Sequence, residues 1–344
     1  MRLAFAGASG AGKSTLMAAC GGRKVLGAPR SREEAGQAVL TVPDGRVEAL
    51  AAMFNPQKIT YAQIIFVDPP MPPLRPEDPA ARLPGELRQA DGLIMVAANF
   101  PGSLCGGPQE QIDSLEQDLI LNDLITVERR LERVAQDKQR GRSLDNEELG
   151  LLEKARLILD QDRPLREERV FARHPKLKGF ALLSAKPLLV VLNNGDNDTS
   201  APVLRLPEGV KAQPIVVRAG LEADLAELEE KERAEFISGY GLSGTALDQL
   251  IAGAYHALDA ISFFTVGSDE VRAWTVDKQA PADVAAGVIH SDLQKGFIRA
   301  EVMAYADLME LGSEAAVKKA GRFKLAGRDY AVQDGDILHV RFSV

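Results

Sequence analysis

The chain has 344 residues, of which 45% are hydrophobic and 26% charged, and its formal net charge is −8. This length allows two or three domains with separate cores, and the acidic balance argues against broad nonspecific binding of nucleic acids. No apolar run could span a bilayer, no signal peptide precedes the first predicted strand, and two cysteines provide no disulfide framework, so we expect a cytoplasmic protein that does not bind membranes.

A phosphate-binding loop follows the first predicted strand. Residues 3–6 form a short apolar run, residues 7–15 read GASGAGKST, and residues 15–19 have the composition of a helix. When a GxxxxGKS motif lies between a strand and a helix, its backbone N–H groups surround the β-phosphate of a nucleotide. Lys13 is expected to reach the β- and γ-phosphates and is the candidate catalytic residue, and the Ser14 hydroxyl is a candidate Mg²⁺ ligand. The candidate nucleotide-binding residues here are Ser9, Gly10, Ala11, Gly12, Lys13, Ser14 and Thr15.

Further apolar runs predict a mostly parallel sheet. They lie at residues 38–42, 63–67, 92–97, 187–192 and 214–217, with helical segments between them. Nearly continuous apolar strands are typical of a sheet that is covered on both faces. Asp68 and Asn193 each follow one of these strands directly, so we expect both at the edge that also carries the phosphate-binding loop. Asp68 is the second candidate Mg²⁺ ligand.

Residues 112–178 interrupt this series of strands. Charges of both signs separate apolar residues there, and the apolar residues recur at spacings of three and four. These apolar residues are Leu124, Val127, Leu131 and Val134, followed by Leu149, Leu152, Ala155 and Leu159. The join at residues 139–143 has turn chemistry, and Asp145 and Glu148 have the spacing of a capping box. We therefore expect an α-helical coiled-coil hairpin whose charge runs are solvated faces.

The pattern of polar and apolar residues changes again after residue 262. Polar and apolar residues alternate at 271–276, 297–302 and 337–342, and glycines mark turns between them. This pattern predicts a compact α+β domain. The predicted organisation is an α/β nucleotide-binding domain of residues 1–111 and 179–261, a hairpin insertion of residues 112–178, and a C-terminal domain of residues 262–344.

Several segments resemble the YchF family, also called Obg-like ATPases. The similar segments are residues 263–265, 285–292, 295–301 and 329–337 for the family's ubiquitin-like (β-grasp) TGS domain, and residues 118–124 and 127–131 for its helical insertion. Residues 185–187, before Asn193, resemble its approach to the base-recognition motif. The resemblance implies a G-type P-loop NTPase of the TRAFAC class that binds ATP or GTP with Mg²⁺ and associates with ribosomes or other translation partners, and we expect a monomer.

The chain departs from the family at its switch segments. Asp68 is followed by Pro69, Pro70 and Met71, where the family has a DxxG motif. Prolines fix φ and lack an N–H donor, so we expect poor sensing of the γ-phosphate. Residues 30–35 stand where relatives carry a Mg²⁺-binding threonine, with Ser31 as the candidate substitute. The loop at residues 99–107 lacks the histidine that family members carry nearby.

The base motif also differs, because residues 193–196 read NNGD where the family has NxxE. A carboxylate at Asp196 would accept hydrogen bonds from guanine N1–H and its amine, which favours GTP, whereas the resemblance favours ATP. Asn193 and Asp196 are the candidate base-binding residues, and a plain polar turn is the alternative. Residues 217–220 occupy the place of a second loop whose backbone contacts the base.

We expect a nucleotide-binding protein that hydrolyses its nucleotide slowly at best. The alternative is a non-hydrolysing adaptor that binds ribosomes or RNA through the hairpin and the C-terminal domain. A small-molecule kinase is a third hypothesis and is disfavoured, because kinases need an acceptor pocket and a mobile lid.

Overall fold

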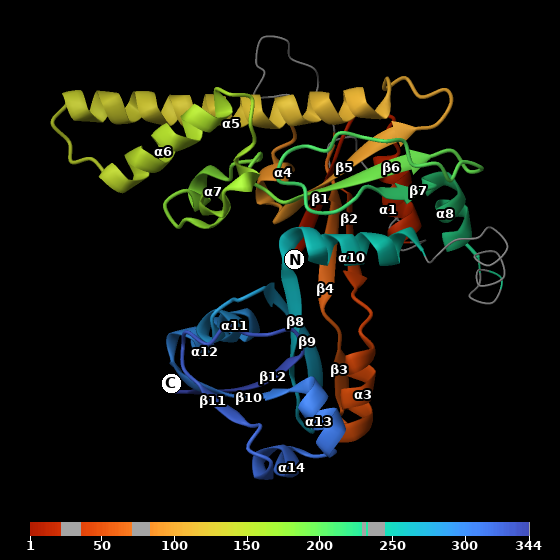
Figure 1. Ribbon diagram of the computed structural model, residues 1–344, viewed down its shortest axis with the longest axis vertical. Coiled ribbons are helices and arrows are strands. Elements are labelled where there is room, and N and C mark those ends of the chain that lie inside the picture. Colours follow the sequence, from red (N-terminus) through yellow and green to blue (C-terminus); the bar gives the residue numbers. More distant parts are fainter. Residues whose placement is uncertain (22–35, 71–82, 229–231, 233–244, 344) are drawn as a thin grey trace. The chain divides into compact units, whose positions relative to one another are not determined.

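The computed structural model describes residues 1–21, 36–70, 83–228, 232 and 245–343 (Figure 1). The chain divides into two compact units. The first unit consists of Arg2–Val39 and Ile65–Ala257, and the second consists of Met1, Leu40–Ile64 and Leu258–Val344. No helix within these described ranges is long and apolar enough to cross a membrane.

A six-stranded sheet in the order β2-β4-β1-β5-β6-β7 forms the centre of the first unit. Its strands are β1 (Arg2–Ala6), β2 (Gly36–Thr41), β4 (Gln63–Asp68), β5 (Gly92–Asn99), β6 (Leu188–Asn194) and β7 (Ile215–Val217). From β4 to β7 every pairing is parallel. Each strand expected from an apolar run is present, and the predicted parallel pairing is confirmed for β4, β1, β5, β6 and β7.

Short helices flank this sheet: α1 (Lys13–Gly21), α4 (Glu86–Gln89), α8 (Ala219–Ala226) and α10 (Ala246–Leu258). Helix α1 packs against α8. All seven residues of β6 are buried, as are seven of the eight in β5. Such burial explains why these strands are continuous apolar runs rather than alternating ones. The parallel arrangement also brings the carboxyl ends of β1, β4, β5 and β6 to one edge of the sheet.

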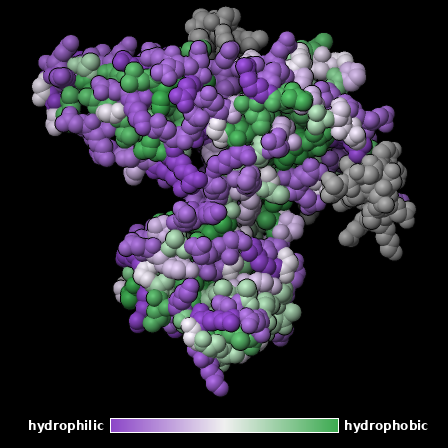
Figure 2. Space-filling model, in the orientation of Figure 1, coloured by the Kyte–Doolittle hydropathy of each residue, from purple (hydrophilic) through white to green (hydrophobic). Residues whose placement is uncertain are grey.

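A long helical arm extends from β5 and is formed by α5 (Pro108–Gln139), α6 (Asn146–Leu159) and α7 (Arg169–Arg173) (Figure 1). The first half of α5 belongs to the core of the sheet, where Ile112 and Leu119 are fully buried. Its second half packs on α6, and an apolar strip lies between the two helices (Figure 2). Helix α5 begins at Pro108, four residues before residue 112, the predicted start of the insertion. The coiled-coil character of the pair stays a prediction.

Asp145 caps α6, as the spacing predicted. Its carboxylate accepts hydrogen bonds from the backbone N–H groups of Glu147 and Glu148, both at 3.1 Å. The Glu148 side chain is instead paired with Arg130 of α5, with 2.6 Å between the charged atoms. The cap thus fixes the start of α6, and Glu148 links the two helices.

The second unit contains a mixed six-stranded sheet in the order β11-β10-β12-β8-β9-β3. Its strands are β3 (Lys58–Thr60), β8 (Ala260–Thr265), β9 (Glu270–Asp277), β10 (Phe297–Ala304), β11 (Lys324–Ala326) and β12 (Asp336–Phe342). Its helices are α3 (Gly45–Phe54), α11 (Ala282–Ile289), α12 (Ser291–Lys295), α13 (Tyr305–Leu311) and α14 (Glu314–Lys319). The α+β character predicted for the C-terminal segment is therefore observed, and its sheet is mixed.

The second unit also contains a segment from the N-terminal third of the chain. Residues 40–64 supply α3 and β3, although the expectation placed all of residues 1–111 in the nucleotide-binding domain. Strand β3 pairs in parallel with β9, and Arg46 of α3 forms an ion pair with Asp334 at 2.8 Å. A three-residue strand has no periodicity that a sequence pattern could reveal, so this pairing had no signal in the sequence.

Candidate nucleotide-binding site

The phosphate-binding loop joins the end of β1 to the start of α1. Three of its glycines, Gly7, Gly10 and Gly12, have φ values of +133°, +86° and +96°. Side chains would also collide there, because a Cβ on Gly7 would lie 2.3 Å from the Val96 carbonyl oxygen and one on Gly12 would lie 2.1 Å from Asn193 Nδ2. Only glycine combines these backbone angles with such close approach. The loop is consequently curled tightly against β5 and β6.

Lys13 lies over the loop that precedes it. Its Nζ donates hydrogen bonds to the carbonyl oxygens of Gly7 at 2.8 Å and Ala8 at 2.7 Å. Burial lowers the pKa of the Lys13 amine, and the nearby Asp68 carboxylate acts in the opposite direction. A buried cation beside the N-terminus of α1 is the arrangement that stabilises a polyphosphate.

Ser14 and Asp68 come together across neighbouring strands. Asp68 ends β4, Ser14 lies in the first turn of α1, and the hydroxyl of Ser14 donates to Asp68 Oδ2 at 2.5 Å. The Asp68 side chain is buried. Because Mg²⁺ prefers oxygen ligands, a hydroxyl and a carboxylate side by side at this loop fit such an ion.

Asn193 connects two separate segments at the carboxyl end of β6. Its Nδ2 donates to the Ala11 carbonyl oxygen at 3.1 Å, and its Oδ1 accepts from the Ala219 N–H at 3.0 Å. The side chain is 5% exposed. Asn193 thereby holds the phosphate-binding loop and the start of α8 in a fixed relation, a role additional to the predicted contact with a base.

Asp196 lies on the exposed turn that follows. Its Oδ1 accepts a hydrogen bond from the Leu221 N–H at 3.1 Å, and a Cβ on Gly220 would lie 2.9 Å from the same oxygen. Arg218 donates to the Asp196 carbonyl oxygen at 3.2 Å. These contacts bring Asp196 together with residues 217–220, and the role of both segments in contacting a base stays a prediction.

A cavity of about 360 Å³ opens beside Lys13. Its walls include Gly7 and Ala8 of the loop, Pro69 after β4, and Leu87 of α4. Helix α5 contributes a polar wall that includes Glu110, Gln111, Ser114 and Asp118. The volume is within the range of small-molecule sites. The cavity is thus an extension of the loop's surface on the side of Lys13.

The sequence and the fold are similar to those of known proteins along nearly their whole length. A "Ribosome-binding ATPase YchF" from Bacillus subtilis is 34% identical over 354 residues, covering 97% of this chain and 96% of the relative. The chain belongs to the YchF family. The profile YchF-GTPase_C, described as "Protein of unknown function (DUF933)", matches residues 260–343.

Two further relatives extend this comparison. A "Ribosome-binding ATPase YchF" from Escherichia coli O157:H7 is 31% identical over 97% of this chain and 96% of its own length. The structure of the Schizosaccharomyces pombe YchF GTPase superposes with a TM-score of 0.74 at 25% identity, covering 99% of this chain and 97% of that one. The resemblance to the YchF family that residues 185–187 and the C-terminal segments indicated is therefore confirmed.

Part of the predicted switch chemistry of this YchF protein falls outside the described residues. Ser31 and the segment 30–35 lie there, as does Met71. Pro69 and Pro70 are described and follow β4 directly. The structure thus brings together Lys13, Ser14 and Asp68 in one group and Asn193 and Asp196 in another, with Asn193 bonded to the loop that carries the first group.

Two residues that contact this site were not identified as site residues from the sequence. Gln111 of α5 is buried, and its side chain bonds both the N–H and the C=O of Ala98, each at 2.9 Å. It thereby attaches the start of α5 to the end of β5. The thiol of Cys105 donates to the Ser9 carbonyl oxygen at 3.2 Å. A glutamine directly before the apolar Ile112 was a weak signal, whereas Cys105 had none.

Proposed function

We propose that this YchF protein binds ATP or GTP with Mg²⁺ and works in association with ribosomes. The observation that carries the proposal is the glycine-dependent loop with Lys13 curled over it and Ser14 bonded to Asp68. Two relatives that span the chain are named ribosome-binding ATPases, which supports the same reading. The nucleotide would be held by Ser9, Gly10, Ala11, Gly12, Lys13, Ser14 and Thr15, with Asn193 and Asp196 at the base.

Magnesium would be held by Ser14 and Asp68. Their hydrogen-bonded oxygens are hard donors of the kind that Mg²⁺ prefers, and they adjoin the loop that would carry the phosphates. A bound Mg²⁺ ion would neutralise charge on the β- and γ-phosphates. Lys13 would supply a second positive charge from within the loop.

Hydrolysis would be slow, with Lys13 as the catalytic residue. Asp68 is followed by Pro69 and Pro70, which lack the N–H donors that could contact a γ-phosphate. Phosphoryl transfer depends mainly on positioning and charge stabilisation, so Lys13 and the loop alone would sustain only a low rate. This proposal makes binding the main property and turnover a minor one.

The base preference rests on Asp196. The backbone N–H of Leu221 holds one of its oxygens, which orients the carboxylate at the rim of the site. Guanine offers two donors to a carboxylate, whereas adenine has an acceptor at N1. Relatives of the same family are named ATPases, so ATP and GTP both stand as candidates.

The other two parts of the chain would carry the macromolecular partner. We propose that residues 262–344 form a β-grasp domain of the TGS type and that residues 112–178 form a coiled-coil insertion. We propose residues 1–111 and 179–261 as the nucleotide domain, with residues 40–64 folding as part of the second unit. The protein would act as a monomer in the cytoplasm, without a membrane partner.

Nucleotide titration of the full chain tests this function. We expect ATP or GTP to bind with Mg²⁺, and Lys13→Ala to weaken binding about 100-fold or more, since it removes charged hydrogen bonds to two phosphates. Lys186→Ala is the matched control, because Lys186 is a half-buried lysine that also donates to a backbone carbonyl, that of Ala90. Direct competition between ATP and GTP would assign the base preference.

The alternative function is a non-hydrolysing adaptor, favoured by the two prolines that follow Asp68. In that case neither nucleotide would bind tightly, and the Lys13→Ala change would leave ribosome co-sedimentation unaltered. Rapid, Lys13-dependent hydrolysis by the isolated chain would contradict both versions, because it would require an effective switch.

A further inference from the structure

The short helix α4 contacts both the cavity beside Lys13 and the base of the helical arm. Leu87 of α4 and Pro84 just before it line that cavity, whereas the next residue, Arg88, bonds to the arm side. Helix α4 is a single turn, and no side chain caps its N-terminus at Gly85. A helix of one turn is unstable by itself in water. The position of α4 therefore depends on the contacts that its side chains form on these two sides.

The Arg88 guanidinium joins α4 to α5 and to the segment that leads from the arm back to β6. Its Nη1 donates to the backbone carbonyl oxygens of Phe180 at 3.2 Å and Ala181 at 3.5 Å. Its Nη2 donates to Oδ1 of the buried Asn122 and to the Thr126 hydroxyl at 3.4 Å, both on α5. A planar guanidinium holds partners in two fixed directions, which a lysine ammonium group does not. Arg88 is thus a bridge among three segments.

The segment that receives this bridge, residues 180–186, belongs to both hydrophobic cores of the first unit. Leu182 packs in the core of the arm together with Leu152 of α6, whereas Leu183 packs in the core of the sheet. Lys186, the last residue of this segment, donates to the carbonyl oxygen of the residue that follows α4. Because packed cores are nearly incompressible, a shift of α4 reaches the arm through this segment.

We propose that Arg88 couples nucleotide binding at the phosphate-binding loop to the conformation of the helical arm. The coupling rests on the proposed function, because the γ-phosphate of a bound nucleotide would lie on the Lys13 side of the cavity. A phosphate there adds charge and volume beside the wall formed by Pro84 and Leu87. The contacts of α4 then differ between the two states of the site, and the Arg88 bridge carries that difference to Phe180 and α5. Arg88 is a positioning residue in this device.

Hydrogen–deuterium exchange of the full chain, with and without saturating Mg²⁺ and ATP or GTP, tests the proposal. The informative amides are those of residues 180–186 and of α6, and those of β5 are the internal reference, because ligand binding stabilises the sheet in every variant. We expect nucleotide to slow exchange in the arm about 5-fold or more in the unchanged chain, the lower end of typical coupling between sites. In Arg88→Lys this ratio should be close to unity, since lysine keeps the charge but cannot bridge.

The matched control is Arg130→Lys. Arg130 also links two segments through its guanidinium, since it pairs with Glu148 across α5 and α6, but it does so within the arm. Its response to nucleotide should equal that of the unchanged chain. Asn122→Ala breaks the Arg88 bridge from the side of α5 and should abolish the response as Arg88→Lys does, so the test does not depend on the folding of one variant. Equal loss in Arg88→Lys and Arg130→Lys, or a full response in Arg88→Lys, would overturn the proposal.

Nucleotide titration of the same samples separates this coupling from the proposed function. A chain that binds neither ATP nor GTP would contradict the proposed function and the coupling with it. A chain that binds nucleotide tightly and shows the same exchange in the arm with and without it would contradict the coupling alone. Arg88 lies outside the phosphate-binding loop, so we expect Arg88→Lys still to bind nucleotide at saturation. Loss of its response would then report loss of coupling rather than loss of binding.

Discussion

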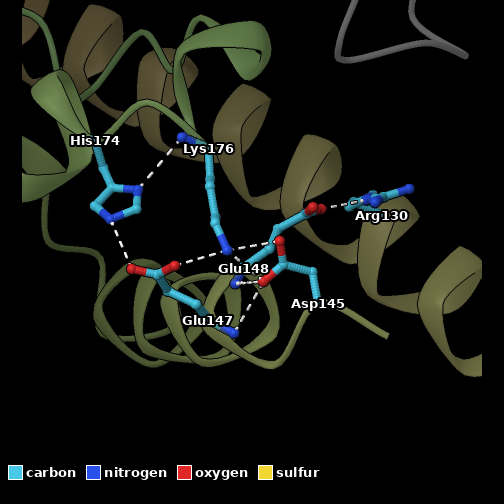
Figure 3. Close-up of polar contacts among 6 residues, drawn as sticks. All are labelled: Arg130, Asp145, Glu147, Glu148, His174 and Lys176. Atoms are coloured by element: carbon cyan, nitrogen blue, oxygen red, sulfur yellow. Dashed lines mark hydrogen bonds and ion pairs between the residues drawn. The ribbon is translucent and has the colours of Figure 1, made fainter. Parts of the chain in front are cut away.

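Polar side chains gather in two places of the first unit, and the two groups differ in how they are held. At the nucleotide edge, Asn193 is buried and bonds the backbone of two segments that are far apart in sequence. On the helical arm, the exposed carboxylates of Asp145 and Glu147 form ion pairs with the half-buried side chains of His174 and Lys176 (Figure 3). Buried bonds to the backbone determine where segments lie, whereas exposed ion pairs contribute little to stability.

The cluster on the helical arm is dense but lies at the surface. The Lys176 amine is 2.6 Å from a carboxylate oxygen of both Asp145 and Glu147, and His174 Nε2 is 3.3 Å from Glu147. The Lys176 amine lowers the pKa of both carboxyl groups, mainly through these hydrogen bonds. Water and salt compete for every one of these charges. The comparison therefore predicts that substitutions at the nucleotide edge lower stability strongly and that substitutions in this cluster lower it little.

At pH 7, Asn193→Ala should have the largest effect on stability. It leaves the Ala11 carbonyl and the Ala219 N–H buried without their partner, and each unpaired group costs about 1–3 kcal/mol. We expect the free energy of unfolding to fall by about 3 kcal/mol. Affinity for nucleotide should fall as well, because the loop loses its link to β6. Urea unfolding and nucleotide titration measure the two effects.

The neighbouring Asn197→Ala is the control, because Asn197 is exposed on the same turn. Its stability and affinity should match those of the unchanged chain. If Asn193→Ala weakened nucleotide binding without loss of stability, the direct contact with a base would be its main role. The comparison between the two regions would then lose its central example.

Asp123→Asn tests a buried carboxylate where α5 meets the sheet. Asp123 is fully buried and accepts hydrogen bonds from Leu183 N–H at 2.8 Å and from the N–H and hydroxyl of Ser184, both at 2.7 Å. Asparagine keeps the size but turns a donor toward the Ser184 N–H, so we expect a loss of about 2 kcal/mol at pH 7. Urea unfolding of both proteins measures this loss.

The same variant should change the pH dependence of stability. Burial raises the pKa of Asp123 to about 6, so the folded chain binds a proton more tightly than the unfolded chain. Stability from this group is present at pH 5 and is lost as the pH rises through 6. The loss caused by Asp123→Asn should thus be about 1.4 kcal/mol greater at pH 5 than at pH 7. Gln117→Ala, which replaces an exposed and uncharged side chain of the same helix, is the control and should show no such difference.

The sequence predicted the parts of this fold that depend on local patterns. The phosphate-binding loop, the apolar strands from β4 to β7 and the Asp145 cap each follow from residues close together in the chain. The position of α3 and β3 in the second unit does not, because it depends on the pairing of Lys58 with Glu270 across the chain. Long-range pairing of such short strands leaves no periodicity in the sequence.

The candidate site likewise has residues that local sequence patterns identified and contacts that only the folded chain reveals. The motif at residues 7–15 and the residues after β4 and β6 identified Lys13, Ser14, Asp68, Asn193 and Asp196 as candidates. The two hydrogen bonds that Asn193 forms, one with Ala11 and one with Ala219, could not be predicted. They depend on the register of β1, β5 and β6, which only the folded sheet provides. Gln111 was missed for the same reason, since its partner Ala98 lies on a strand.

Lys176→Met should have the smallest effect, although it removes the centre of the cluster in Figure 3. Asp145 and Glu147 would regain water, which offsets most of the lost attraction. Asp145 would still cap α6 through the N–H groups of Glu147 and Glu148. We expect the midpoint of urea unfolding at moderate salt to stay within experimental error. Asp145→Ala, which removes the cap, should lower that midpoint more. If Lys176→Met destabilised the chain as much as Asn193→Ala, the distinction between buried backbone bonds and surface ion pairs would not hold here.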